Sequence, residues 1–182
     1  MSHRSVSEVP LPSPEIIDLV RISCSDLPEG STRLSACFYK HLFAQAPEMR
    51  SMFSADLGPQ EQRMADALLS VVRNLNTPDR VAQYLQRLGR QHHDQLGVLP
   101  EHYPYVGRAL IRAVSEVSPT WSSSMSSAWV LVYQWVTAHM LTGAQQAASS
   151  SRAFRSRPSP PGRTPTDTHP YPPSPLTEVP RS

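Results

Sequence analysis

The sequence lacks any run of about 18 apolar residues, so we expect no membrane-spanning helix. Residues 1–15 also lack the apolar stretch of a secretory signal, which favours a cytoplasmic protein. Lysine is nearly absent: Lys40 stands beside 16 arginines, and the net charge is only +2. A balance so close to neutral gives no reason to expect nucleic-acid binding.

Cysteine is also scarce. Cys24 and Cys37 are too far apart for a CxxC motif and too few for a disulfide framework. We therefore expect two reduced thiols, as in a cytosolic protein. The Gly-rich motif GxGxxG of dinucleotide-binding folds does not occur either.

No stretch shows the alternating apolar and polar pattern of β-strands. Apolar residues instead recur at helical spacing, and prolines stand at the joints between the helical stretches. The length suits one domain with a real core. We predict an all-α domain of about seven helices over residues 13–148, preceded by a flexible arm at 1–12.

Residues 149–182 have a different composition, with nine prolines, five arginines and seven serines but almost no aliphatic residues. Such a segment cannot bury a core, so we predict a disordered tail with local polyproline II character.

Two histidines, His92 and His93, stand side by side near the end of a predicted helix that begins after Thr77 and stops before Gly97. A neutral imidazole there is able to ligate a metal or haem iron. By itself, however, a histidine at a helix end is more often an exposed polar residue that suits the helix dipole. The surrounding motifs have to decide between the two interpretations.

Five motifs follow one another in order: FYKHLF, PEMRSMF, DLGPQEQRM, HHDQLGVLPEHY and AWVLVY. In this order, over about residues 13–145, the chain resembles the globin family, and among its members the single-domain bacterial globins related to the haem domain of flavohaemoglobins. The resemblance implies a globin fold around haem b.

The resemblance also assigns residues on the distal side of the haem. FYKHLF supplies Tyr39, which would point at the distal face, and PEMRSMF supplies Phe53, which would pack on the porphyrin. DLGPQEQRM begins the distal helix and supplies Gln60 and, one turn later, Met64. Tyr39 and Gln60 would donate hydrogen bonds to the bound ligand.

The proximal iron ligand has two candidates, because the segment is one residue longer than the family pattern. Read forward, LGRQH selects His92. Read backward from Pro100 and Tyr103, the same segment selects His93. Pro100 fixes the start of the next helix, and Tyr103 is a family landmark at that offset. These anchors favour His93, with His92 as the alternative and Tyr103 beside the proximal site.

Flavohaemoglobins complete their proximal network with a carboxylate on the last helix. Counting from AWVLVY, that position falls at Ala144, and the segment TGAQQ contains no acid. This departure argues against a strongly electron-donating proximal histidine, and hence against peroxidase-like activity.

The resemblance implies that the protein binds O₂, and also NO and CO, and that bound O₂ can convert NO to nitrate. Residues after Ala148 are too few and too rich in proline to form a flavin or NAD reductase domain, so turnover would need a separate reductase. The alternatives are a non-enzymatic O₂ store, carrier or sensor, and a globin-like domain that has lost its haem.

Overall fold

The computed structural model describes residues 9–155. Their helices are, in chain order, α1 (Pro14–Ser23), α2 (Arg33–Gln45), η2 (Pro47–Met52), α3 (Gly58–Arg73), α4 (Pro78–Leu96), η3 (Pro100–His102), α5 (Tyr103–Val117) and α6 (Ser123–Arg155), where η marks a 3₁₀ helix. No strand occurs among these residues, so the all-α prediction is confirmed.

Proline opens four of these elements, at Pro14, Pro47, Pro78 and Pro100. The backbone N–H groups in the first turn of a helix have no acceptor within the helix, so proline loses no hydrogen bond there. Its fixed φ also suits the helical conformation. These are the joints at which the sequence predicts new helices to begin. Gly97 ends α4 in the left-handed conformation, at φ +62°, which glycine adopts without steric cost.

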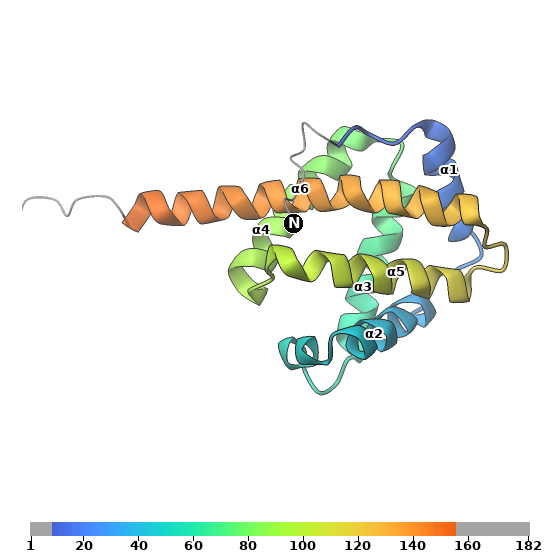
Figure 1. The fold of residues 1–182 in the computed structure, drawn as a ribbon, viewed down its shortest axis with the longest axis horizontal. Helices are drawn as coiled ribbons and strands as arrows, with labels where there is room; N and C mark the ends of the chain where they lie inside the picture. Colours follow the sequence, from blue (N-terminus) through green and yellow to red (C-terminus); the bar gives the residue numbers. More distant parts are fainter. Residues whose placement is uncertain (1–8, 156–182) are drawn as a thin grey trace, which may run out of the picture.

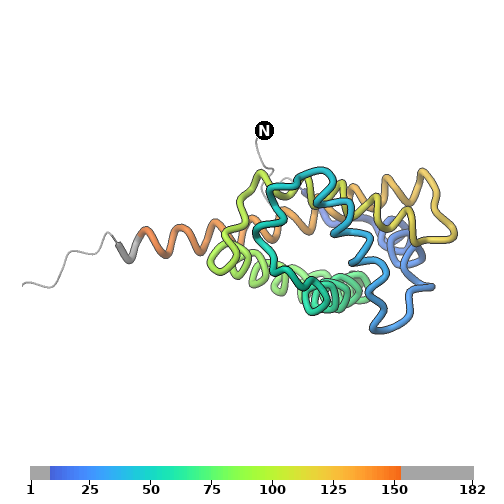
Figure 2. Tube along the Cα trace, turned by 90° about the horizontal axis from the view of Figure 1, so that it is seen from below, coloured from blue at the N-terminus to red at the C-terminus, as the bar shows by residue number. Residues whose placement is uncertain are grey.

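α5 and α6 run side by side along the long axis of the molecule (Figure 1). α6 packs mainly against α4 and α1, while α5 packs mainly against α2. Both views show the C-terminal turns of α6 extending past the other helices (Figures 1 and 2).

Two glycines allow α4 and α6 to cross at very short range. A Cβ on Gly89 of α4 would lie 1.9 Å from the carbonyl oxygen of Met140, and a Cβ on Gly143 of α6 would lie 1.9 Å from that of Gln86. Each helix therefore presents a bare backbone position to a carbonyl of the other. This reciprocal contact fixes α4 against α6 along the stretch that leads to the histidine pair.

A buried hydrogen bond joins the first helix to the last. The indole Nε1 of Trp129 donates to the hydroxyl of Ser23 at 2.8 Å, and that hydroxyl in turn donates to the carbonyl of Val20 at 2.7 Å. Trp129 and Ser23 are almost fully buried. Because both polar groups are satisfied, the tryptophan adds its large apolar area to the core at little polar cost.

The last helix runs to Arg155, so the boundary that the sequence places between residues 148 and 149 falls inside α6. Ala147 is still buried, and the hydroxyl of Ser150 bonds back to the carbonyl of Gln146 within the helix. The first proline of the tail is Pro158, so nothing before it forces the helix to stop. Residues 1–8 and 156–182, which hold most of the predicted arm and most of the predicted tail, lie outside the described residues. Of the helices that the structure describes, none combines the length and the apolar character needed to cross a membrane.

Candidate functional site

A tyrosine and a glutamine from two different helices meet in a half-buried polar contact. Gln60, in the first turn of α3, donates from Nε2 to the hydroxyl oxygen of Tyr39 on α2 at 3.0 Å. Tyr39 is only 3% exposed. Its burial raises the pKa of the phenol above its ordinary value, although the bond from Gln60 opposes that shift. Tyr39 therefore remains a neutral O–H donor at physiological pH.

The direction of this hydrogen bond decides what the pair can do. Because Tyr39 accepts from Gln60, its own hydroxyl hydrogen is available for a further acceptor. The guanidinium of Arg63 donates to Oε1 of Gln60 at 2.9 Å, which holds the amide with its nitrogen towards Tyr39. The pair thus offers an oriented O–H donor supported by an amide.

Aromatic rings surround Tyr39. Phe53 meets it edge-on with ring centroids 5.3 Å apart, and Phe43 stacks on it at 5.7 Å. The rings of Phe43 and Phe53 also contact each other, with centroids 5.5 Å apart. Arg50 holds the corner that carries Phe53: its guanidinium donates to the carbonyls of residues 53–55 and lies over the ring of Phe43. The sequence-predicted residue Phe53 is therefore placed beside Tyr39 and is half-buried.

Apolar side chains on α3 and α4 remain only half-buried. They include Met64 and Leu68, one turn apart on α3, and Tyr84 and Leu88, one turn apart on α4. Although the two helices are consecutive, they make little direct contact with each other. Apolar surface left open on two helices that do not pack together is suited to an apolar ligand.

His92 is held in a defined orientation near the end of α4. Its Nδ1 lies 2.9 Å from the carbonyl oxygen of Leu88, one turn earlier. Burial lowers the pKa of His92, while the carbonyl opposes that shift, so the ring is neutral at physiological pH. A neutral ring that donates from Nδ1 keeps an unprotonated Nε2, which is the form that binds metals.

His93 has a different environment. Its side chain is 36% exposed, and its Nδ1 lies 3.0 Å from a carboxylate oxygen of the neighbouring Asp94. Adjacent residues of an α-helix point about 100° apart, so the two imidazoles cannot face the same ligand. The structure therefore separates the two sequence-predicted candidates: one is half-buried and tied to the helix backbone, and the other is at the surface.

Helix α4 ends in a hydrogen-bonded turn around Gly97. The N–H of Val98, just after Gly97, bonds to the carbonyl of His92 at 3.1 Å. Nδ1 of His102 then accepts the N–H of Leu99 at 3.1 Å, which closes the corner before α5. One sequence signal for His92 is the leucine four residues before it, because a leucine at that spacing lies on the same helix face.

Tyr103 is buried at the start of α5, where a hydrogen bond ties its backbone to α6. The hydroxyl of Tyr133 donates to the carbonyl of Tyr103 at 2.6 Å, and the Tyr133 ring occupies the space that a Cβ on Gly107 would need. Burial raises the pKa of Tyr103 to about 12 and raises that of Tyr133 as well.

Ala144 lies on α6 next to the glycine that crosses α4. Its methyl group has no acidic function, and the partner of His92 Nδ1 is a backbone carbonyl. A carbonyl fixes the orientation of the ring. As a neutral acceptor, it raises the electron-donating strength of the imidazole less than a carboxylate would.

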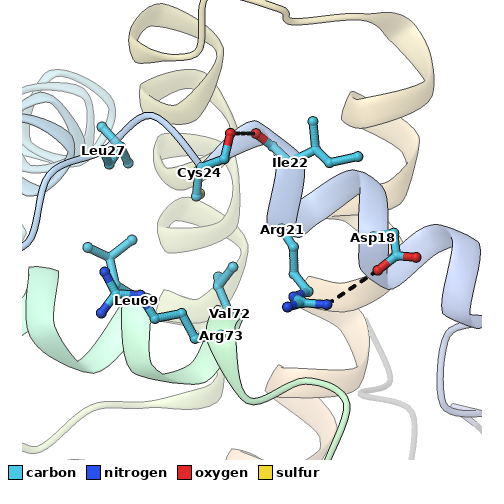
Figure 3. A pocket seen from close by; sticks show the side chains of 9 residues that line it. Asp18, Arg21, Ile22, Cys24, Leu27, Leu69, Val72 and Arg73 are labelled. Carbon is cyan, nitrogen blue, oxygen red and sulfur yellow. Dashed lines mark hydrogen bonds and ion pairs between the residues drawn. The ribbon is translucent and has the colours of Figure 1, made fainter.

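A separate pocket of about 400 Å³ lies between α1 and α3, away from these residues (Figure 3). Asp18 and Arg21 form an ion pair at its rim, at 3.5 Å, and Arg73 approaches from α3. Cys24 also lines it, but burial raises the pKa of this thiol to about 11, so it is not a nucleophilic thiolate at physiological pH. The pocket has no evident catalytic group.

Comparison with known proteins identifies the family of this chain. The family model described as Globin matches residues 36–140, which is more than half of the chain. Flavohaemoproteins are among the curated relatives: that of Bordetella pertussis is 29% identical over 147 residues. The alignment covers 79% of this chain but only 36% of the relative, so the chain spans about a third of that protein's length.

Solved structures agree with the helical arrangement. An engineered carbene transferase, a candidate nitric oxide dioxygenase from Rhodothermus marinus, is 29% identical with a TM-score of 0.65, and the match covers 79% of this chain and 98% of that one. A bacterial globin from Campylobacter jejuni has a TM-score of 0.66 at 24% identity, with 75% and 99% covered. The second likeness concerns the fold alone.

Proposed function

Since the chain belongs to the globin family, which implies a haem cofactor, we propose that it holds haem b through His92 and binds O₂ beneath Tyr39 and Gln60. The observation that carries the proposal is the bond from Nδ1 of His92 to the Leu88 carbonyl. When bound, haem iron would supply the coordination position that a diatomic ligand takes.

Counting back from Pro100 and Tyr103 favours His93. We choose His92 instead because of the environment of each ring. Metal-binding histidines nearly always donate their second ring nitrogen to a backbone carbonyl or a carboxylate, which fixes the tautomer. His92 makes such a bond from a half-buried position, whereas His93 bonds to the exposed Asp94 next to it in the chain.

The residues around the proposed haem suit a flat apolar group with two different faces. The half-buried apolar side chains of α3 and α4, Met64 and Leu88 among them, provide apolar contact. On the distal side, Tyr39 provides the O–H donor that stabilises partial negative charge on bound O₂, and Gln60 orients it. Phe53 holds the ring of Tyr39 from the side.

We further propose that the oxygenated protein converts NO to nitrate. The balance is NO plus O₂ plus one electron giving nitrate, and the electron would come from a separate reductase. The similarity to flavohaemoproteins and to a candidate nitric oxide dioxygenase supports this proposal. The buried Tyr39 donor supports it too, since slow loss of O₂ lets NO arrive first.

One observation favours a second function, reversible O₂ storage or transport. His92 bonds to a carbonyl, and α6 offers Ala144 where an acid would strengthen the proximal imidazole. A weaker proximal donor favours binding of O₂ over its activation.

Absorption spectra of two single variants test the ligand assignment. We expect His92→Ala to lose the five-coordinate ferrous spectrum and to recover it when free imidazole is added, whereas His93→Ala keeps the wild-type ferric, ferrous and CO spectra. The opposite pattern would show that His93 holds the iron. Haem-free protein in all three preparations would remove the proposal itself.

A second experiment separates the two functions. Ferrous oxygenated protein is mixed with NO, and nitrate is measured with and without an added flavin reductase and NADH. Stoichiometric nitrate in one turnover, becoming catalytic with reductase, supports NO conversion. Oxygenated protein that releases O₂ normally but yields no nitrate would leave storage or transport as the function.

A further inference from the structure

Three potential metal ligands meet between α2 and α5, in a cluster that the proposed haem site does not use. Cys37 and His41 lie one turn apart on α2, so their side chains share one helix face. Glu116 reaches them from α5. The ligand atoms of the three residues all lie within 4.8 Å of one another.

Glu116 contacts each of the other two side chains with a different oxygen. Its Oε1 lies 2.7 Å from Nε2 of His41, and its Oε2 accepts a hydrogen bond from the Cys37 thiol at 3.2 Å. Nε2 of His41 is buried, and its contact with Glu116 has the length of an ion pair but not the direction of a hydrogen bond. The ring nitrogen and the carboxylate oxygen thus face each other in the way that two ligands of one cation do.

We propose that Cys37, His41 and Glu116 bind a zinc ion. Thiolate, imidazole and carboxylate are the three side-chain ligands that zinc takes in proteins, and three of them with an open fourth position form a common set. Zinc bond lengths place tetrahedral nitrogen and oxygen ligands about 3.3 Å apart. The 2.7 Å between His41 and Glu116 is slightly shorter, so a small outward movement of the two side chains makes room for the ion.

Without an ion, the cluster keeps Cys37 as a neutral thiol. Burial and the adjacent carboxylate of Glu116 raise the pKa of the Cys37 thiol, against the weaker effects of Lys40 and Arg33. A dication at the centre reverses this balance: the thiol loses its proton to solvent, and the thiolate and carboxylate together neutralise the ion. Arg112, 3.7 Å from Glu116 on the same helix, is more than half exposed and competes only weakly for the carboxylate.

The ion would join α2 to α5. Tyr39 lies between Cys37 and His41 in the sequence, but it points into the aromatic cluster, so zinc would bind outside the proposed haem pocket. Zinc would stabilise the folded protein because the unfolded chain does not hold the three ligands together. This inference does not depend on haem binding.

X-ray absorption at the zinc edge tests the coordination directly, since haem iron does not absorb there. The full-length, haem-loaded protein is treated with a chelator, dialysed and titrated with zinc against a chromophoric competitor. We expect one tightly bound zinc per chain, with one sulfur at about 2.3 Å and nitrogen or oxygen neighbours at about 2.0 Å. Binding without a sulfur neighbour, or no binding that competes with the dye, would overturn the proposal.

Matched variants assign the ligands. We expect Cys37→Ser, His41→Asn and Glu116→Gln each to abolish stoichiometric binding and the zinc-dependent rise in Tm, with an unchanged Soret band as proof of folding. Cys24→Ala, at the other cysteine, should bind zinc as the wild type does. Wild-type affinity in Cys37→Ser or His41→Asn would show that zinc binds elsewhere. The X-ray measurement on the wild type decides the proposal even if a variant fails to fold.

Discussion

The close crossing of α4 and α6 makes Gly89→Ala a strong test of the structure. The new Cβ would lie 1.9 Å from the carbonyl oxygen of Met140 and 2.5 Å from its carbonyl carbon. A relaxed contact between carbon and a carbonyl oxygen is about 3.3 Å or longer, so the helices must separate by roughly 1.4 Å. The obstacle is backbone, which cannot rotate out of the way as a side chain does.

The expected cost follows from two opposing effects. Overpacking in a well-packed core costs about 1–3 kcal/mol, and a clash with helix backbone belongs at the upper end of that range. The higher helix propensity of alanine compared with glycine stabilises the helix by about 1 kcal/mol. We therefore expect Gly89→Ala to lower the free energy of unfolding by about 2 kcal/mol, which for a domain of this size is a fall in Tm of about 4–8 °C.

Urea unfolding followed by circular dichroism measures this loss on the haem-loaded protein. The matched control is Gly58→Ala at the start of α3, where a Cβ would meet only the exposed carboxylate of Asp56 at 3.3 Å. This side chain can move, so the control should change stability by no more than about 0.5 kcal/mol. A Gly89→Ala protein as stable as the control would refute the close crossing.

Three further predictions concern single groups. Tyr39→Phe removes the distal O–H donor and should speed O₂ dissociation by about 10–100-fold. This factor corresponds to the 1.5–3 kcal/mol of a hydrogen bond to a charged group. Equal O₂ dissociation rates for the variant and the wild type in stopped-flow measurements would contradict the role of Tyr39. Tyr133→Phe removes the side-chain donor of the Tyr103 carbonyl, which keeps its bond within α5. The variant should lower the free energy of unfolding by about 0.5–1.5 kcal/mol, measured in urea; an unchanged midpoint would show that the 2.6 Å bond adds nothing. Because burial raises the pKa of Tyr103 to about 12, the folded state holds this proton more tightly than the unfolded chain. The resulting stability is fully present below pH 10, the ordinary pKa, and is lost as pH rises towards 12; Tyr103→Phe should flatten that part of the pH profile of Tm, and an identical profile would count against the assignment.

Much of the fold could be predicted because its signals are local. Pro14, Pro47, Pro78 and Pro100 mark helix starts for reasons contained within one turn. The prediction that Tyr39 and Gln60 lie together depended instead on the family resemblance. Their spacing in the sequence does not predict a contact, because they stand on different helices. The structure brings them within hydrogen-bond distance.

Other features could not be read from the sequence because they depend on distant contacts. Cys37 and His41 show helical spacing, but Glu116 joins them only because α5 packs on α2. The composition does not determine the end of α6 either: the sequence change at residue 149 is clear, yet the helix continues to Arg155, ahead of the first proline at Pro158.

The histidine pair shows why counting along the chain can favour a different residue from the three-dimensional environment. Counting back from Pro100 assumes that the extra residue lies before the histidine, whereas counting forward from LGRQH assumes that it lies after the histidine. The surroundings of the two rings supply the independent criterion. His93 is 36% exposed and bonds to its neighbour Asp94. The ring of His92 is turned about 100° from that of His93 and bonds to the carbonyl of Leu88, whose half-buried side chain lies on the same face of α4.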